Sequence, residues 1–578
     1  MRVRPLRPRA RRALTVGVIV AGCYVAFCGV WLALARREAQ AGVDQLHQIR
    51  EDLDAKGLLD GTGIPLIESA ERDFGSARDR VRSPLLAPVR LTPVLGRQIE
   101  SFGSLSSAAA EVAAISVDGA EAARSELRGS IPPGEGRVRS LRDLADIAEV
   151  TAARVATVPL GPSFDLIGPA AAARGDFARE KDGVELALLH TRDAARSLAD
   201  VMAGPSTYLL IAGNNAEMRA GSGMFLSAGL LEFDGGRLTL SDLEPTADLR
   251  PEGGVPYRDA DLEARWGFAN PNREWRNLGL TPRFPVTAEM AARMWEASGR
   301  PSIDGVIAVD VVALAGLLEA TGPVEVGDET VTAENVQQLL LHDQYLDDPD
   351  QTERRDRLSE VARAVLERFD GSSPDLPALA DGLRDSVSGR HLMMWSRSGR
   401  AQSAWEQAGL SGSVDDDAML VGLLNRGGNK LDQYQAVRGR VRTREVAEGT
   451  LVSLRLQVTN EVPEGQPAYI AGEGAYGRYD GFLALTMPQG SEVVRSSLAE
   501  GVTAGRDGRS QALAVPAVLS PGDTVEWRVS FLVPPGVETL AVAPSARVPH
   551  IEWSGPGGLR WNDRDTPQMD LALPSNRM

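Results

Sequence analysis

The stretch Tyr208-Leu-Leu-Ile-Ala-Gly213 decides the fold of the central part of this chain. It is apolar, carries no charge and stops at a glycine, as a short buried strand does. A second apolar run follows at residues 224–233, and Asp234-Gly235-Gly236 separates it from residues 238–240. Two such runs around a glycine turn are typical of a β-hairpin. A sheet is therefore expected to begin near Pro205.

Further along, residues 305–309 predict another strand, residues 311–320 a helix and residues 324–326 a strand, with Thr321-Gly322-Pro323 ending the helix. This succession indicates a β-α-β unit and hence a sheet layered with helices. More helices are expected over 334–341, 354–368 and 376–383. The apolar run 419–424 is expected to be helical too, because Asp415 to Asp417 precede it.

From about Asp432 the apolar period becomes two. Val452, Leu454 and Leu456 alternate with polar residues, and residues 525–531 repeat the pattern. Short strands between Pro- and Gly-rich turns predict a β-sandwich over 431–560, followed by a tail over 561–578.

On the N-terminal side, residues 36–203 are rich in Ala, Leu, Arg and Glu, with apolar residues at helical spacing. Glycine and proline clusters divide this region into several helices. The pattern predicts an antiparallel helical bundle that forms a stalk. A coiled coil is the alternative, although no heptad persists for three or four repeats.

The run from Ala13 to Ala35 contains no charge. At about 1.5 Å per residue it is long enough for the roughly 30 Å core of a bilayer. Six arginines precede it in residues 1–12 and two follow it, which predicts a cytoplasmic N-terminus and a bulk outside the cytoplasm. A cleaved signal peptide is the alternative, but no clean cleavage site follows the run. A single-pass protein of the cell membrane, with the lipid bilayer as a partner, is expected.

Composition limits the kinds of catalysis, metal site and binding partner that this chain can have. Cys23 and Cys28 lie within the apolar run, so the remaining chain offers no thiol catalysis and no cysteine-ligated zinc. The net charge is −17, which opposes binding to nucleic acid and to bulk anionic polymers. Only Lys56, Lys181 and Lys430 among the 62 basic residues are lysines, which is typical of a GC-rich genome.

The densest polar cluster, Gly213-Asn-Asn-Ala-Glu-Met-Arg219, follows the first strand. Ligands favour strand ends in layered sheets, so Asn215 and Arg219 are candidates to hold a phosphate or a carboxylate. The competing interpretation is a structural turn, in which Asn side chains cap the backbone and Arg219 pairs with Glu217 or a later acid.

Two further sets of charged residues are candidates. Asp304 and Asp310 flank the strand at 305–309 and are candidates for a divalent-cation site, against a helix N-cap at Asp310 and a turn at Asp304. Arg354 and Arg355 open a helix from which a guanidinium could reach a phosphate, against a solvated charged face.

The loop that contains Trp266, Phe268 and Trp275 also holds Asn270 and Asn272, a composition suited to sugar binding or to a lid. Its alternative is a loop packed on the core by its tryptophans. The five histidines are scattered, so local spacing predicts neither a zinc site nor a catalytic triad.

The stretch from Tyr208 to Arg219, the segment Ile303-Asp-Gly-Val-Ile-Ala-Val-Asp310 and the segment Leu317-Leu-Glu-Ala-Thr-Gly-Pro-Val324 together resemble the bacterial envelope family known as domain of unknown function 4012. Asn425-Arg-Gly-Gly-Asn-Lys430 fits the same pattern. The resemblance covers the chain from about Pro205 to the expected sandwich. It implies a cell-envelope protein and no particular activity.

Residues 303–326 are also similar to a core segment of the LytR-CpsA-Psr phosphotransferases, which move glycopolymers from polyprenyl-pyrophosphate carriers to peptidoglycan. By that resemblance Arg219 and Arg354 or Arg355 would grip pyrophosphate, and Asp304 would hold magnesium. The Arg-Asp pair of that family after the hairpin is absent, because residues 238–248 contain no arginine.

These observations predict an α+β multidomain protein with an N-terminal transmembrane helix, a helical bundle stalk, a central α/β layered domain over 204–430 and a C-terminal β-sandwich. The expected function is binding of a phosphate-bearing or glycan envelope ligand. The alternatives are a magnesium-dependent transferase of the LytR-CpsA-Psr kind acting on a polyprenyl-pyrophosphate, and a non-catalytic spacer for protein partners.

Overall fold

The computed structural model describes residues 27–45, 57, 61–127, 131–163, 166–347, 351–498, 502–564 and 566–571, without the side chains of residues 347, 351–356 and 358. The chain divides into two compact units. The first comprises residues 1–129 and 142–195, and the second comprises residues 130–141 and 196–578. The α+β multidomain class predicted from the sequence is confirmed.

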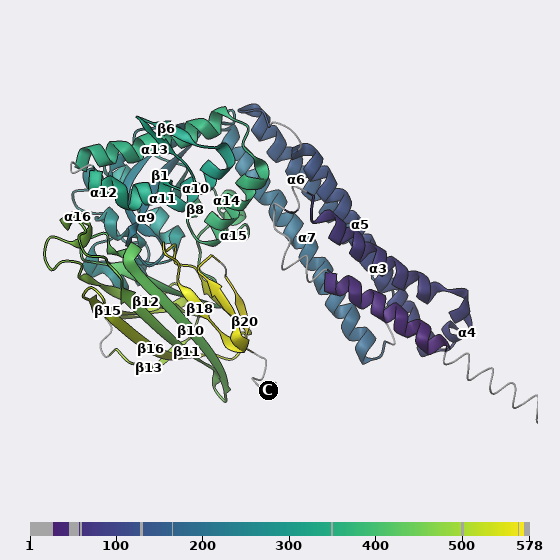
Figure 1. Cartoon of the computed structure of the whole chain (residues 1–578). Coiled ribbons are helices and arrows are strands. Elements are labelled where there is room, and N and C mark those ends of the chain that lie inside the picture. The colour runs from purple at the N-terminus through teal and green to yellow at the C-terminus, as the bar shows by residue number, and fades with distance from the viewer. Residues whose placement is uncertain are drawn as a thin grey trace, which may run out of the picture. The chain divides into compact units, whose positions relative to one another are not determined.

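The first unit is helical (Figure 1). Its elements are a helix over residues 27–45, α3 (Ile64–Arg82), η1 (Pro84–Leu86), α4 (Ala87–Arg90), α5 (Leu95–Leu127), most of α6 (Glu135–Ala156) and most of α7 (Gly168–Ala203). Helices α3 and α5 pack through Ala70 and Phe74 on one side and Ala109 and Ala110 on the other. Small side chains on α5 let the phenylalanine ring enter between the helices.

The transmembrane helix predicted from Ala13 to Ala35 is contradicted. Within the part of the chain that the structure describes, no helix is at once long and apolar enough to cross a bilayer. Residues 13–26 of the predicted span lie outside the described residues, and the rest belongs to the helix over 27–45. The predicted single-pass placement in a cell membrane, which depended on that span, is corrected with it.

The described part of the span shows a physical reason for the correction. Leu32 and Ala35 pack in one cluster with Val81 and Ile99, and the indole of Trp31 donates a hydrogen bond of 3.0 Å to the carbonyl oxygen of Arg80. These apolar side chains are therefore used for packing between helices. A run without charges has the same composition whether its partner is lipid or protein.

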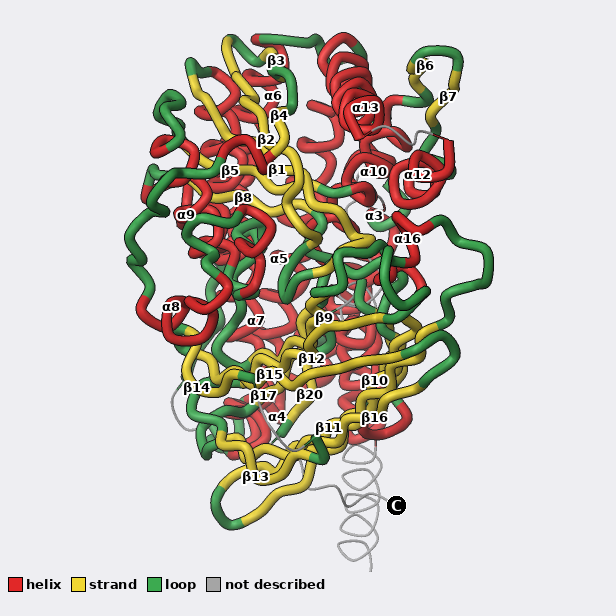
Figure 2. The backbone as a smooth tube through the Cα atoms, turned by 90° about the vertical axis from the view of Figure 1, so that its left-hand side faces the viewer, coloured by secondary structure: helices red, strands yellow, loops and turns green. Residues whose placement is uncertain are grey.

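The second unit contains a sheet of six strands, which are labelled in Figure 2. Its order is β3 (Arg237–Leu240), β2 (Gly223–Asp234), β1 (Ser206–Met218), β5 (Gly305–Val309) and β8 (Leu392–Ser396), with β4 (Glu244–Pro245) paired to β2. Strands β1 and β5 are parallel, and the other neighbours are antiparallel. The long strand β1 lies at the centre, as its apolar sequence requires.

The predicted hairpin after β1 is confirmed, whereas the predicted β-α-β unit is wrong. Gly235 and Gly236 both have positive φ angles, and they turn β2 into β3. Residues 324–326, in contrast, form β6 (Val324–Val326), which pairs only with β7 (Glu329–Val331) across a turn at Gly327. The three residues of β6 pair with the next strand along the chain. The parallel partner of β5 is β1 instead.

Helices cover both faces of this sheet. Helix α9 (Phe284–Ala297) packs on the face that carries Leu209 and Ile211. On the face that carries Leu210 lie α10 (Val311–Thr321), α13 (Gln351–Gly371) and α15 (Gly399–Gln407), and α14 (Leu376–Ser388) packs on α10. Shorter helices lie in the connections: η2 (Thr246–Leu249), α8 (Ala260–Trp266), η3 (Gly267–Ala269), η4 (Trp275–Leu280), α11 (Val336–Gln338), η5 (Leu339–Asp343), α12 (Gln344–Asp347), η6 (Leu431–Tyr434), α16 (Ala468–Ala471) and η7 (Pro556–Gly558).

The rest of the second unit is a sandwich of two six-stranded sheets around one apolar core. One sheet has the order β13 (Glu492–Ser496), β16 (Thr524–Val533), β11 (Gly449–Asn460), β10 (Gln435–Val446), β18 (Glu552–Ser554) and β19 (Arg560–Asn562). The other has the order β14 (Thr503–Asp507), β15 (Ser510–Leu519), β12 (Tyr479–Met487), β9 (Ala418–Asn425), β17 (Thr539–Ala543) and β20 (Gln568–Asp570). The alternating runs at 452–458 and 525–531 are neighbouring strands, β11 and β16.

Residues 419–424, expected to be helical, form strand β9 instead. Every residue of β9 is buried. One face of its sheet packs in the sandwich core, and the other face joins Leu424 and Phe482 to the core under α9. A strand covered on both faces shows a continuous apolar run without alternation, which sequence periodicity cannot distinguish from a buried helix.

Candidate functional site

A cavity of about 540 Å³ lies in the second unit, on the Leu210 face of the six-stranded sheet. Strands β1, β2 and β5 form one wall, and helices α10 and α13 form another. Its lining is largely aliphatic: Leu210, Leu226, Leu243, Val309, Leu314, Leu317, Leu340, Leu341 and Leu366. Volume and lining are those of a small-molecule site.

Two local irregularities shape this cavity. Strand β1 shifts register against β2 between Asn214 and Met218, and both Asn214 and Glu217 line the cavity. Residues three apart on a regular strand point to opposite faces, so the shift places both side chains on one side. The helix after α11 widens to π geometry over Leu339–Asp343, which brings Leu340 and Leu341 to the wall.

Polar side chains gather at one part of the lining. The ammonium of Lys430 forms an ion pair with the Glu217 carboxylate. It also lies 5.4 Å from the ring centroids of both Tyr345 and Tyr469. The hydroxyl of Tyr345 accepts a hydrogen bond of 3.0 Å from the side-chain amide of Asn214. Two aromatic rings around a paired ammonium make a cation–π site.

Burial dominates the electrostatics of Lys430. The side chain is 4% exposed, and burial lowers the pKa of its ammonium to about 7. The Asp432 carboxylate acts against this shift. A lysine that titrates near neutral pH beside an apolar cavity is typical of functional sites. An arginine at this position would stay charged.

Four charged residues line the cavity, and three of them are already engaged. Glu217 and Lys430 neutralise one another. Asp310 accepts hydrogen bonds from the Val312 amide at 2.9 Å and from the Asn215 side-chain amide at 2.7 Å. The fourth, Arg276, is exposed, and no carboxylate of the described residues pairs with it. The cavity therefore presents one unpaired cation at its rim.

Asp310 is also the N-cap of α10, as its position before Val311 suggested. The side-chain ring nitrogen Nδ1 of His391 lies 2.7 Å from its Oδ2 atom. Asn215 ties the same carboxylate to the chain near Ala546, whose carbonyl oxygen accepts at 2.8 Å. Asp310 and Asn215 thus act together in a buried structural contact beside the cavity.

Arg219 does not line the cavity. Its guanidinium donates to the carbonyl oxygens of Arg276 at 2.7 Å, Met218 at 2.9 Å and Asn425 at 2.8 Å. Burial lowers the pKa of Arg219 to about 10. Its Nη2 atom donates to the side-chain oxygen of Asn277 at 3.4 Å. Through its three backbone partners this side chain joins β1, η4 and β9. Its role is to hold the sheet to the sandwich.

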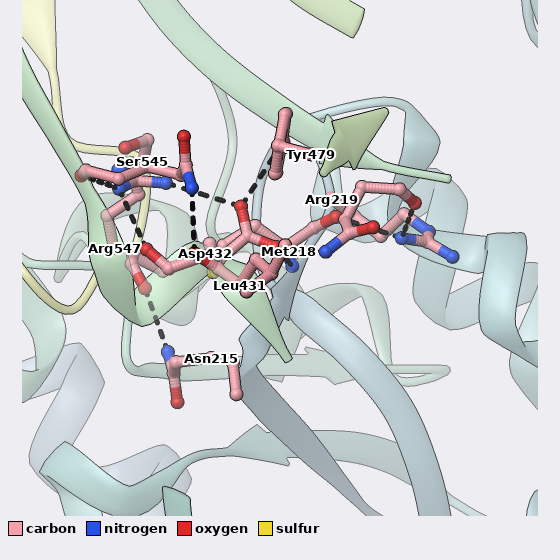
Figure 3. Close-up of polar contacts among 12 residues, drawn as sticks. Asn215, Met218, Arg219, Leu431, Asp432, Tyr479, Ser545 and Arg547 are labelled. Atoms are coloured by element: carbon pink, nitrogen blue, oxygen red, sulfur yellow. Dashed lines mark hydrogen bonds and ion pairs between the residues drawn. The ribbon is translucent and has the colours of Figure 1, made fainter. Parts of the chain in front are cut away.

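A second buried charge, Asp432, lies beside Arg219 in the close-up of Figure 3. Asp432 accepts hydrogen bonds from the Met218 amide and the Asn425 side chain, both at 2.9 Å, and its Oδ1 atom lies 3.5 Å from Nη1 of Arg547. The side chains of Asp432 and Arg547 are both 0% exposed. Burial raises the pKa of Asp432, while Arg547 opposes that rise.

The remaining loop residues also have structural contacts. The Asn272 side chain donates to the Val255 carbonyl at 2.8 Å and accepts from the Tyr257 hydroxyl at 3.1 Å. Asn270 has a left-handed backbone with φ of 51° at the end of η3. Trp266 and Trp275 are 3% and 1% exposed, so their rings offer no stacking surface to a sugar. The loop is packed on the core by its tryptophans.

Asp304 and Asp310 are not brought together, because they stand at opposite ends of β5, about 20 Å apart at ~3.3 Å per residue. Asp304 accepts a hydrogen bond of 2.7 Å from the Thr207 amide. No group of three or more metal-ligating side chains occurs among the described residues. Arg354 and Arg355 belong to α13, but their side chains lie outside what the structure describes.

Comparison with known proteins matches one segment of the second unit to a family model. Residues 203–345 match the family described as "Protein of unknown function (DUF4012)". The resemblance to this family is confirmed over that segment, and the resemblance to LytR-CpsA-Psr phosphotransferases is not shown. The chain matches no curated protein and no solved structure.

The DUF4012 segment supplies β1, β2, β5, α10 and the π-helix, and it ends at Tyr345. Lys430 and Tyr469 come from beyond it. Sequence reasoning missed Lys430, Glu217, Tyr345, Tyr469 and Arg276 as site residues. Two signals were available: Lys430 is a rare lysine in an arginine-rich chain, and Glu217 stands in the densest polar cluster. The two tyrosines carry no local signal.

Proposed function

We propose that this protein binds an amphiphilic ligand, with the apolar chain of the ligand in the cavity and an anionic head group, such as a phosphate, at Arg276. The observation that carries the proposal is an aliphatic cavity of about 540 Å³ with one unpaired cation at its rim. An apolar chain gains free energy by leaving water, in proportion to the area buried. An anion at the rim gains a charge-assisted hydrogen bond.

The ligand carries the phosphate group expected from the sequence, but that group binds at Arg276 and not at Arg219. The guanidinium of Arg219 donates to three backbone oxygens and to the Asn277 side chain, whereas that of Arg276 takes part in no ion pair of the described residues. The neutral pair of Glu217 and Lys430 supplies further hydrogen-bonding atoms to the wall of the same cavity. Binding alone accounts for these features, so no reaction is proposed.

The test compares two probes of equal chain length, dodecyl phosphate and dodecanol, with the full chain, below the micellar concentration. Calorimetric titration should show at least tenfold tighter binding of the phosphate, because a charge-assisted hydrogen bond contributes about 1.5–3 kcal/mol and 1.4 kcal/mol is tenfold. Arg276→Gln should remove this preference. Leu314→Trp, which fills the cavity, should weaken both probes.

Arg273→Gln is the matched control, since Arg273 is an exposed arginine of the same loop that does not line the cavity. It should bind both probes as the wild type does. Failure of the wild type to bind either probe would overturn the proposed function. Survival of the phosphate preference in the Arg276 variant would refute the assignment of the head group.

A further inference from the structure

The outer face of one sheet of the sandwich is rich in arginines. Strand β10 alternates buried residues with Arg438, Arg440, Arg442 and Arg444, and all four side chains are exposed. The alternation places them on the outer face of the sheet, away from the sandwich core. This basic face belongs to a chain whose net charge is −17.

The register of the strands aligns arginines across the sheet. Arg440 pairs with Arg455 on β11, and Arg455 pairs with Arg528 on β16. On the other side, Arg440 pairs with Ser554 on β18, which pairs with Arg560 on β19. Four arginines thus lie on one line across five strands, about 19 Å long at ~4.8 Å per strand. This arginine row consists of Arg440, Arg455, Arg528 and Arg560.

Such a row is unfavourable by itself, because like charges directly opposite on neighbouring strands destabilise a sheet. Acids relieve part of it: Glu526 pairs with Arg455 and Arg528, and Glu552 pairs with Arg438 at 2.9 Å. Across the described residues, no carboxylate pairs with Arg440, Arg442, Arg444 or Arg560. Within the described part of the chain, Arg440 and Arg560 in the row, and Arg442 and Arg444 beside it on β10, can therefore bind an external anion.

A hollow of about 750 Å³ lies along this row. Arg438, Arg440, Arg455 and Arg560 line it together with Trp561. The Trp561 ring stacks on Trp553 at 5.9 Å between centroids and packs against the sandwich core, so it closes the hollow from beneath the arginines. Gln457, Ser554 and Asn562 add uncharged hydrogen-bonding groups to the lining.

We propose that this arginine row binds a linear anionic polysaccharide, laid across the strands. The arginines would bind its carboxylate, phosphate or sulfate groups. Glu526 and Glu552 would accept hydrogen bonds from sugar hydroxyls, and the side-chain amides would both donate and accept them. A duplex nucleic acid, with one charge per about 1.7 Å, suits this face less well, because Glu526 and Glu552 lie among its arginines. The site is separate from the cavity, so it stands or falls independently.

The experiment measures binding of polygalacturonate, dextran sulfate and uncharged dextran to the full chain at several salt concentrations. The wild type should bind both anionic polymers, more weakly as salt rises, and should not bind dextran. Arg440→Gln with Arg560→Gln should weaken binding at least tenfold at low salt. These exposed side chains leave the fold intact, which a thermal melt would check.

Arg400→Gln with Arg478→Gln is the control, because both arginines are exposed, lie off the row and change the net charge equally. It should bind within about twofold of the wild type, and the anionic polymers should raise the melting temperature of the control but not of the row variant. Equal binding of dextran, undiminished binding by the row variant, or tighter binding of polyuridylate RNA would each overturn the proposal.

Discussion

Lys430 shows how one residue type carries information that composition hides. The chain uses arginine for nearly all of its basic positions, yet it places lysine between Tyr345 and Tyr469 at the cavity. The guanidinium of an arginine keeps its proton in proteins, whereas a buried ammonium can release it. The choice of lysine therefore makes the charge of the cavity wall dependent on pH.

The stability of the second unit should depend on pH through Lys430. The folded protein releases this proton near pH 7 and the unfolded chain near 10.5. Between those values the unfolded chain binds more protons, so the free energy of unfolding rises with pH. Urea unfolding from pH 6.5 to 9.5 should show this rise relative to Lys430→Met with Glu217→Gln, which carries neither charge. A difference that is constant over this range would contradict the assigned pKa.

Arg219 shows the limit of prediction from one residue. Its sequence context of asparagines and glycines fits an anion site and a structural turn equally well. What decided between them was the carbonyl oxygen of Asn425, which is 206 positions away in the sequence. The pairing of Arg219 with Glu217, which the sequence offered as an alternative, is wrong, because Glu217 pairs with Lys430.

At the scale of elements, local signals identified strands and turns well. The glycine pair after β2 and the Asp310 cap of α10 were both correct because each depends on residues within one turn. Elements buried on both faces were harder. The sequence of β9 predicts a helix, because the pairing of this strand with β12 and β17 is not encoded within residues 418–425.

Helices α10 and α14 provide an element-scale prediction. A Cβ added to Gly316 would lie 2.9 Å from the Cα of Gly382, closer than real side chains approach. Gly316→Ala should therefore lower the free energy of unfolding by about 1–3 kcal/mol, through overpacking. Chemical denaturation would measure it. Gly399→Ala, at a position in α15 with nothing within 4 Å, should be neutral or stabilise by up to about 1 kcal/mol. Equal effects of the two changes would argue against the close approach.

At the scale of the molecule, the α/β sheet and the sandwich share one structure in the second unit. Asp432 receives hydrogen bonds from β1 and β9 and an ion pair from Arg547. Arg219 bonds β1 to β9 from the same region. These buried charges come together only when both parts are assembled.

Removing one partner of this junction should therefore be costly. Asp432→Ala leaves Arg547 charged and buried, and it should lower the free energy of unfolding by about 3–5 kcal/mol. Denaturant unfolding monitored by tryptophan fluorescence measures the loss. Glu289→Ala, which breaks a solvent-exposed pair with Arg258, should cost at most about 1 kcal/mol. A small effect at Asp432 would mean that the junction does not depend on this charge.

By itself the sequence determined the α+β class, the family segment around β1 and β5, the hairpin turn and the alternating strands of the sandwich. Each of these depends on a period or a turn within a few neighbouring residues. Tertiary structure alone decided the helix packing of Leu32 and Ala35, the parallel pairing of β5 with β1, the burial of Arg219 and the cavity around Lys430. Those features join residues tens to hundreds of positions apart, and the free energy of such contacts depends on the whole fold.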